Sequence, residues 1–205
     1  MISVELVEKL KKIIVSEESH LKCFSCEWQY SDKLDLERKN ITSSDGTQKY
    51  KYIEHTILGE SNKVCVVIGF NPAESDVNEF DGTNNKIYAC LKEKYGSYIL
   101  INLYPQVSKT KDEWDEGDEE DAKFGPVLIK LLETLLDAKE DVLVFWGRSV
   151  GVDEQIGTLL SKLQENNLLY FTVKKGTNLH YHPARVTIDI KKATKDSLIK
   201  TTSIL

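Results

Sequence analysis

Long apolar runs and cysteines are both scarce in this chain. No stretch is long enough to cross a bilayer, which indicates that the protein has no transmembrane segment. The N-terminal residues lack the uninterrupted apolar core of a signal peptide. Four cysteines in 205 residues do not form a disulfide framework of the secreted type. We therefore expect a cytoplasmic protein without membrane contact.

An excess of basic charge is also missing, because the formal net charge is −6. This argues against indiscriminate nucleic-acid binding, which needs basic groups to neutralise phosphates. The charges are unevenly spread: acidic side chains crowd residues 112–121, and lysines with Arg185 dominate the chain after residue 173. Either the C-terminal part forms a locally positive face, or both runs are ordinary solvated surfaces.

The cysteines and histidines leave a metal site open as an alternative. Cys23 and Cys26 have the spacing that begins some metal and iron–sulfur sites, which Cys65 and Cys90 would complete. Against this, the last two lie in an apolar strand and on a helix face, where free cysteines act as small hydrophobic residues. No set of ligands with zinc spacing accompanies the histidines. We expect no metal and no cofactor.

The apolar periodicity predicts an α/β protein. A helix is expected over 1–18, and strands over 21–30 and 50–58 joined by a polar loop around Ser43–Gly46 into an edge hairpin. Strands and helices then alternate: strands at 64–68, 98–103, 142–146 and 168–173, helices at 84–94, 124–136 and 150–164, and a short strand and a last helix from about residue 191. This order predicts a three-layer α/β/α fold with a mostly parallel central sheet. We expect one domain over 1–205, with 1–60 as helix and edge strands and 61–205 as the strand–helix core.

Polar residues stand at the ends of four predicted strands. Asn71 follows the first, Asn102 lies within the second, Trp146 and Gly147 follow the third, and a segment containing His180, His182 and Arg185 follows the fourth. In open α/β sheets the ligand crevice lies beyond the carboxyl ends of the strands. We expect these side chains to converge there.

The two asparagines have a functional and a structural interpretation each. Asn71 either positions a water or ligand carbonyl, or simply opens a turn before Pro72. Asn102 either reads the amide-like edge of a nucleobase or satisfies its amide on the backbone. Gly69 would allow close backbone approach. Asparagine is no general base, so any hydrolysis would depend on positioning and would be slow.

The segment around His182 offers an anion site. Pro183 would hold this imidazole so that it donates to a developing anion, and His180 and Arg185 would add phosphate contacts. The alternative is that these are exposed loop residues. The acidic loop over 104–121, which contains Trp114, is expected to be either a lid over the crevice or disordered.

In order along the chain, these segments resemble the uracil-DNA glycosylase superfamily. Gly69-Phe70-Asn71-Pro72-Ala73 is similar to the Gly-x-Asn-Pro-Gly motif, and Ile99-Leu100-Ile101-Asn102 to the strand whose Asn reads the base. Val144-Phe145-Trp146-Gly147 resembles the family's Leu-Leu-Trp-Gly, and His182-Pro183 its last motif.

The resemblance implies roles for these positions. Asn71 would orient the attacking water, Asn102 would recognise the base, His182 would stabilise the leaving base, and Phe70 or Tyr104 would stack on it. Ala73 replaces the last glycine of the first motif, and Ala184-Arg185 replaces the small residues that help to extrude a base, which places duplex repair in doubt.

A second resemblance covers nearly the whole chain. The Asn-Pro-Ala-Glu-Ser-Asp run with Asp81 and Thr83, the Asn102-Leu103 strand end and His182-Pro183 are similar to a bacterial and phage family called domain of unknown function 1643. It supports the fold and implies no activity.

Three functions remain open. The first is a uracil-DNA glycosylase-like N-glycosidic hydrolase acting on a nucleobase in single-stranded DNA or in a nucleotide. The second is a non-catalytic nucleobase- or nucleotide-binding protein of the same fold. The third is a protein interaction domain that retains only the fold. The sequence indicates no oligomeric state.

Overall fold

The computed structural model describes residues 4–16, 21, 29–30, 38–44, 49–74, 81–108, 118–136, 141–145, 163, 167–172 and 189–192. They form, in order, α1 (Val4–Val15), β1 (Gln29–Tyr30), β2 (Arg38–Ser44), β3 (Lys49–Ile57), β4 (Val64–Gly69), α2 (Gly82–Leu91), β5 (Ser97–Asn102), α3 (Glu119–Leu135), β6 (Asp141–Val144), β7 (Asn167–Thr172) and β8 (Asp189–Lys192). Most of the predicted helix over 150–164, Trp114 and the final helix lie outside these residues.

These strands form one eight-stranded sheet in the order β1-β2-β3-β5-β4-β6-β7-β8. The four strands β5, β4, β6 and β7 are parallel to one another, and the remaining pairs are antiparallel. The predicted α/β class is therefore confirmed, and the parallel arrangement holds for the central strands. Val64 to Gly69 runs through the middle as a nearly continuous apolar strand, as expected for a strand that is covered on both faces.

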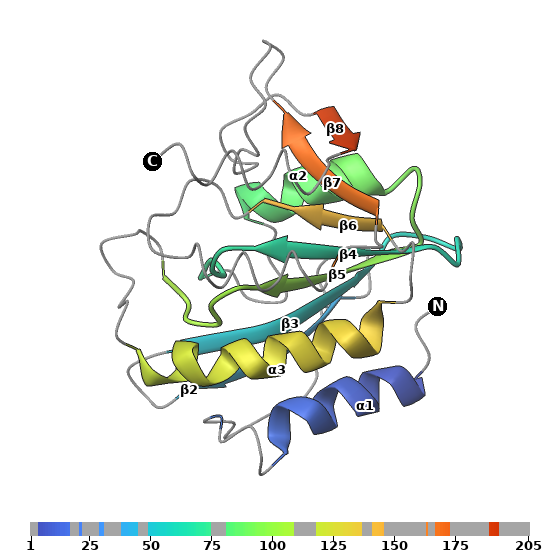
Figure 1. Ribbon diagram of the computed structural model, residues 1–205. Helices are drawn as coiled ribbons and strands as arrows, with labels where there is room; N and C mark the ends of the chain where they lie inside the picture. The colour runs from blue at the N-terminus through green and yellow to red at the C-terminus, as the bar shows by residue number, and fades with distance from the viewer. Residues whose placement is uncertain are drawn as a thin grey trace.

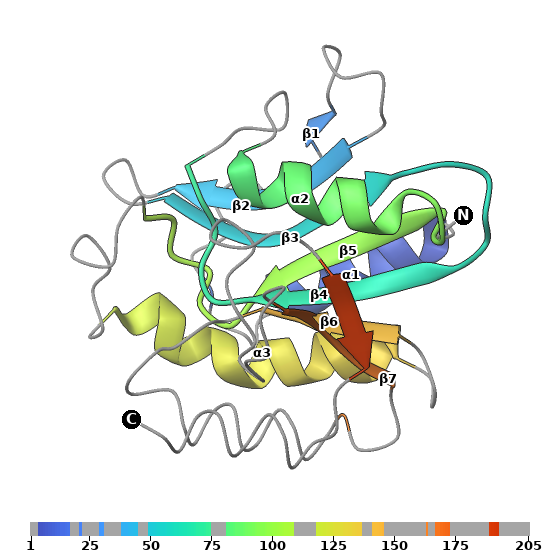
Figure 2. The same cartoon turned by 90° about the horizontal axis from the view of Figure 1, so that it is seen from above.

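Helices cover both faces of the sheet, which gives three layers (Figure 1, Figure 2). On one face, Leu10 and Ile14 of α1 and Phe124 and Leu128 of α3 pack on the sheet. On the other face α2 packs through Ile87 and Leu91. Alternate residues of the central strands enter the two clusters, as the pleat of a strand requires: Val66 and Ile68 belong to the first, Cys65 and Val67 to the second.

The N-terminal strands differ from the prediction. Arg38–Ser44 forms β2, so Ser43 and Ser44 belong to a strand and not to a loop. This strand then pairs along its whole length with β3, and β5 pairs with the other edge of β3. The predicted edge strand at 50–58 is therefore an interior strand. Backbone hydrogen bonds stabilise β2 although its side chains are polar, so its sequence shows no apolar periodicity that would predict a strand.

Other boundaries shift by a few residues. Helix α3 begins five residues before the predicted start. An exposed ion pair joins Lys123 to Glu119 (3.5 Å) in its first turn, and the Tyr50 hydroxyl donates to Asp118 (3.0 Å) just before the helix. At the other end of the chain, residues 191–192 belong to β8 and not to a helix. The described helices are all too short or too polar to span a bilayer.

A buried tyrosine, Tyr95, contacts the first residue of β6. The Tyr95 hydroxyl donates to Asp141, which also accepts from the exposed Lys94 ammonium at 3.3 Å. Burial, and then the hydrogen bond to Asp141, raises the pKa of the Tyr95 phenol. This contact lies at the opposite end of the parallel strands from the cavity described next.

Candidate functional site

A cavity of about 250 Å³ opens at the carboxyl ends of the central strands, on the α2 side of the sheet. Its wall consists of residues from β3, from the ends of β4, β5 and β6, and from the start of α2: Lys51, Glu54, Asn71, Pro72, Ala73, Asp81, Gly82, Thr83, Asn84, Leu100, Asn102, Ser108 and Phe145. This is the place where open α/β sheets bind ligands. Its volume lies just under the range of drug-sized pockets, so it suits a single small ring better than an extended ligand.

Gly69 makes room for two of the cavity's side chains. It is the register partner of Asn102 across the β4–β5 ladder, and β6 flanks it on the other side. A Cβ on Gly69 would collide with Oδ1 of Asn102 and would lie 2.7 Å from Cζ of the Phe145 ring. The glycine therefore lets the carboxamide and the aromatic ring close over the end of β4.

Asn102 has a buried carboxamide that faces the cavity. The residue is 4 % exposed, and its amide makes no hydrogen bond to another residue within the described part of the chain. A buried amide without a partner costs about 1–3 kcal/mol, which a ligand or a water in the cavity would recover. Its donor and acceptor are both available to such a ligand.

Asn71 is fixed in a different way. Its Nδ2 donates to Oγ of Ser108 at 2.8 Å, with longer contacts to the carbonyls of Ser108 and Pro72 at 3.4 Å. These contacts engage the donor side of the amide. Oδ1 is thereby oriented as an acceptor, which suits a group that must hold a water by one of its O–H bonds.

Backbone hydrogen bonds make this end of the sheet rigid. The β4–β5 pairing continues past both strands, because Leu103 and Tyr104 donate to the carbonyls of Gly69 and Phe70, and Ser108 donates to Pro72. The same segment is tied to β3, where the Lys51 amide donates to the Pro105 carbonyl at 2.8 Å. Ser108 is therefore held beside Asn71 before any ligand arrives.

An irregularity in β3 brings a lysine and a glutamate to the cavity. Ile41 pairs with Ile53 and Thr42 with Lys51, so Tyr52 is an extra residue opposite β2. Such a bulge reverses the alternation of side chains. Tyr52 and Ile53 both join the core toward α1 and α3, and Lys51 and Glu54 both line the cavity.

Lys51 and Glu54 form a buried ion pair. Their side chains are 8 % and 1 % exposed, and Nζ lies 3.9 Å from Oε2. The Lys51 ammonium also lies 3.4 Å from the Ala73 carbonyl, across the cavity wall. Buried charges of opposite sign that stay paired are tolerated, whereas removal of one partner leaves a costly isolated charge.

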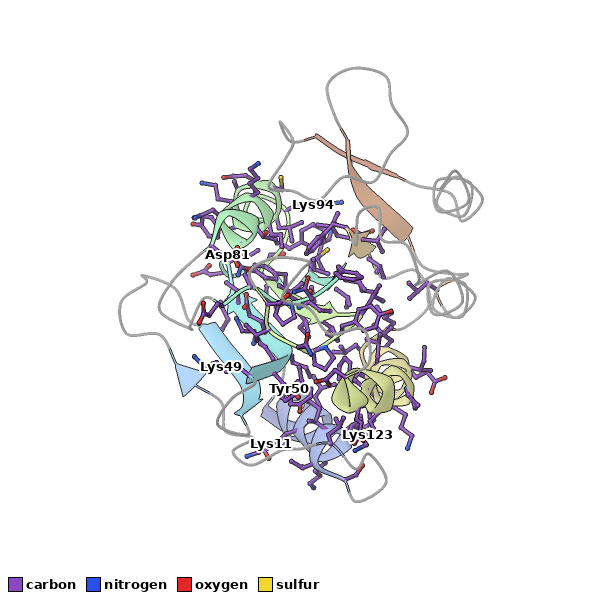
Figure 3. All side chains as sticks on the ribbon, turned by 90° about the vertical axis from the view of Figure 1, so that its left-hand side faces the viewer. Lys11, Lys49, Tyr50, Asp81, Lys94 and Lys123 are labelled. Atoms are coloured by element: carbon purple, nitrogen blue, oxygen red, sulfur yellow. The ribbon has the colours of Figure 1, made fainter. Side chains whose placement is uncertain are left out.

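The start of α2 forms the opposite wall. Oδ1 of Asp81 accepts from the backbone amides of Thr83 and Asn84, both at 2.7 Å, which is the usual cap of a helix N-terminus. Asn84 is buried and its Oδ1 accepts from the Tyr98 hydroxyl at 3.2 Å. In Figure 3, Asp81 lies on the α2 side of the sheet and Tyr50 on the side toward α1 and α3. The cap carboxylate makes this helix end a poor binding site for phosphate.

The structure brings some of the predicted residues together. Asn71 and Asn102 line one cavity, where Asp81 and Thr83 join them, and Gly69 lies against the Asn102 side chain. Phe70 and Tyr104 pack edge to face with ring centroids 5.1 Å apart, against the core toward α1 and α3. They are not among the residues lining the cavity, so their stacking role stays a prediction. Trp146, Gly147, His180, His182 and Arg185 lie outside the described residues.

Sequence reasoning missed Lys51, Glu54 and Ser108, and for Phe145 it gave no role. The available signal was the run Lys51, Glu54, His55 and Thr56, which is unusually polar for a buried strand.

The described residues offer no candidate metal site. Among the described residues, no three His, Cys, Asp or Glu side chains are arranged to hold a metal ion. Cys65 is buried in β4 and Cys90 packs against the same cluster under α2, as small hydrophobic residues do. Cys23 and Cys26 lie outside the described residues.

Comparison with known families gave one match. A family model described as "Protein of unknown function (DUF1643)" matches residues 52–184, a range that contains every residue of the cavity wall except Lys51. No curated protein and no solved structure matched the chain.

Proposed function

The chain belongs to the DUF1643 family, and we propose that it is an N-glycosidic hydrolase acting on a nucleobase, similar in fold and site to the uracil-DNA glycosylase superfamily. The observation that carries this proposal is the meeting of Asn71 and Asn102 in one cavity, in different hydrogen-bonding states. One amide is locked so that it presents an acceptor. The other is left open for a ligand.

Asn102 is the base-reading group. Nucleobase edges alternate carbonyl acceptors with N–H donors, and a carboxamide supplies the complement of both. The cavity beside it contains the apolar Leu100 and the ring of Phe145, which suit the faces of a planar base. Because the amide is buried, a ligand that left it unsatisfied would bind poorly, which gives selectivity.

Asn71 is the water-positioning group. The water donates one hydrogen bond to Oδ1, and its oxygen attacks the anomeric carbon of the sugar. The carbon–nitrogen bond breaks, the base leaves with the bonding electrons, and the base then takes up the proton that the attacking water releases. In the resemblance to the glycosylases, His182 stabilises that anionic base. Asparagine removes no proton, so the rate enhancement comes from orientation and electrostatics.

The substrate is a single-stranded DNA or a nucleotide. The small cavity accepts one base, and the net negative charge disfavours tight contact with many phosphates. Extrusion of a base from a duplex costs a few kcal/mol and is aided by inserted side chains, which the Ala184-Arg185 sequence does not supply.

Release of free base tests this proposal. The full-length protein is incubated with single-stranded oligonucleotides and with nucleotides that carry each of the common bases and uracil, and released base is measured by chromatography. We expect release for at least one base, and a fall on Asn71→Ala and on His182→Ala. An exposed substitution such as Glu93→Gln serves as the control. Absence of release from the entire panel rules out the hydrolase.

A second function, nucleobase binding without catalysis, is favoured because both carboxylates of the cavity are already engaged in other contacts. Of the two acidic residues that line it, Glu54 is paired with Lys51, and Asp81 caps α2. Neither is placed as a free general base. Under this alternative, the protein binds a base saturably, Asn102→Ala abolishes binding without unfolding the protein, and no base is released.

A further inference from the structure

The cavity contains two charged side chains that would determine which base it accepts. This inference rests on the proposed function. Beside Asn102 lies the buried Lys51–Glu54 pair, which the resemblance to glycosylases does not include. The pair is brought to the cavity by the bulge at Tyr52. A bulge that re-aims side chains beside a ligand site is a common functional device.

The sheet places this pair next to the base-reading amide. Strand β3 neighbours β5, and Glu54 is the register partner of Leu100. Leu100 and Asn102 project from the same face of β5, two residues apart. Adjacent strands are separated by about 4.8 Å, so a ring that hydrogen bonds to Asn102 extends over Glu54 or Lys51.

The two charged groups have opposite hydrogen-bonding requirements. A carboxylate only accepts hydrogen bonds, and an ammonium only donates them. A ligand that matches the Lys51–Glu54 pair therefore presents an N–H donor to Glu54 and an acceptor to Lys51. Uracil and thymine have two carbonyl oxygens with one N–H between them. When Asn102 accepts from that N–H, only carbonyl oxygens remain, and these can accept from Lys51 but cannot donate to Glu54.

We infer that the cavity selects a nucleobase with an exocyclic amino group beside an acceptor, as in guanine and cytosine, with Glu54 accepting from the amino group and Lys51 donating to the neighbouring acceptor. Guanine fits best, because its carbonyl oxygen, ring N–H and amino group follow one another along one edge, so that Asn102 can bind the first two and Glu54 the amino group. The lysine and glutamate remain neighbours in the complex, so their charges stay balanced when the ligand binds.

Equilibrium binding of four nucleosides to the full-length protein tests the inference. Guanosine, cytidine, uridine and thymidine are titrated by calorimetry at one pH and salt concentration. We expect an amino-bearing nucleoside to bind roughly 10- to 100-fold more tightly than uridine and thymidine, the discrimination of one good paired contact. Equal or tighter binding of uridine overturns the inference and leaves the proposed function in place. Binding of none of the four, with no base release, removes the proposed function itself.

The variant Glu54→Gln separates recognition from structure. Glutamine has the same shape and adds an N–H donor, so we expect weaker guanosine binding and stronger uridine binding than in the natural protein. Glu93→Gln, an exposed change just beyond the C-terminal end of α2, is the matched control and should leave both unchanged. An unaltered preference in a folded Glu54→Gln protein shows that the ion pair is only structural and overturns the inference. If this variant does not fold, the preference of the unmodified protein decides.

Discussion

Asn102 and Gly69 are partners across the β5–β4 ladder, and the carboxamide of Asn102 lies where a side chain on residue 69 would have to be. The amide that we propose to read the base thus occupies space that only a glycine at position 69 leaves free. Phe145 uses the same space from the other side. Three neighbouring strands therefore cooperate to present one amide to the cavity.

Gly69→Ala tests this arrangement. The added methyl group forces Asn102 and Phe145 apart, so we expect a loss of about 1–3 kcal/mol in the free energy of unfolding, typical of overpacking. Nucleobase binding should weaken as well, because the amide moves. Urea unfolding and calorimetry measure the two effects. Gly59→Ala is the matched control, since a Cβ there meets nothing within 4 Å; an equal loss in both variants would contradict the explanation.

Ser108→Ala should separate water positioning from base binding. The change removes the 2.8 Å hydrogen bond that orients Asn71 and leaves Asn102 untouched. We expect the rate of base release to fall roughly 10- to 100-fold, the usual effect of a misplaced reacting group, with little change in base affinity. Single-turnover kinetics at saturating substrate measure the first quantity, and equilibrium titration measures the second. Ser97→Ala, a buried serine at the start of β5, is the control.

Asp81→Ala should loosen the α2 wall of the cavity. Loss of the two 2.7 Å capping bonds is expected to lower the free energy of unfolding by about 0.5–2 kcal/mol. Asn is as good a cap as Asp, so Asp81→Asn should restore most of this stability. Thermal and urea unfolding of the three proteins measure the difference. A loss as large with Asn as with Ala would show that the charge and not the cap is required.

The Tyr95–Asp141 contact predicts a pH dependence of stability. The pKa of Tyr95 is raised in the folded protein above its ordinary value of 10.0, chiefly by burial. Its contribution is therefore fully present below about pH 10 and is lost as the pH rises above it, because the unfolded chain then ionises more readily. The loss approaches about 1.4 kcal/mol per pH unit for one group.

Tyr95→Phe removes that contribution. We expect the variant to be less stable at pH 8 by about 1 kcal/mol, the worth of a hydrogen bond, and to lose less stability than the natural protein between pH 10 and 11. Urea unfolding at each pH measures both. Tyr88→Phe, which alters a half-exposed tyrosine of α2, controls for general alkaline effects. Parallel pH curves for the natural protein and Tyr95→Phe would refute the assignment.

Several elements could be predicted from sequence because their signals are local. The strand from Val64 is apolar on both faces and ends at Gly69, Asn71 and Pro72, a pattern with few alternatives. The helix over residues 82–91 and the strand ending at Asn102 were found in the same way, with ends shifted by one to three residues. Once those strands are parallel, the meeting of the two asparagines follows from topology.

Other elements depend on pairing that no local pattern reveals. Strand β2, from Arg38 to Ser44, is polar and exists because its backbone pairs with β3. The placement of Lys51 and Glu54 depends in turn on the register of that pairing, since the extra residue Tyr52 is defined only against the opposite strand. A regular strand would direct side chains three residues apart to opposite faces. The charged wall of the cavity was therefore missed.

The bulge at Tyr52 also ties the charged pair to the pairing of β3 with β2. Lys51 and Glu54 are three residues apart, so a β3 without the bulge would direct one of these charges into the apolar core toward α1 and α3. Removal of Tyr52 would instead leave the two charges two residues apart in a regular strand, again on one face. A slip of the β2–β3 pairing that abolished the bulge would thus strand a lysine or a glutamate in the interior without its partner, even with every side chain of the chain unchanged.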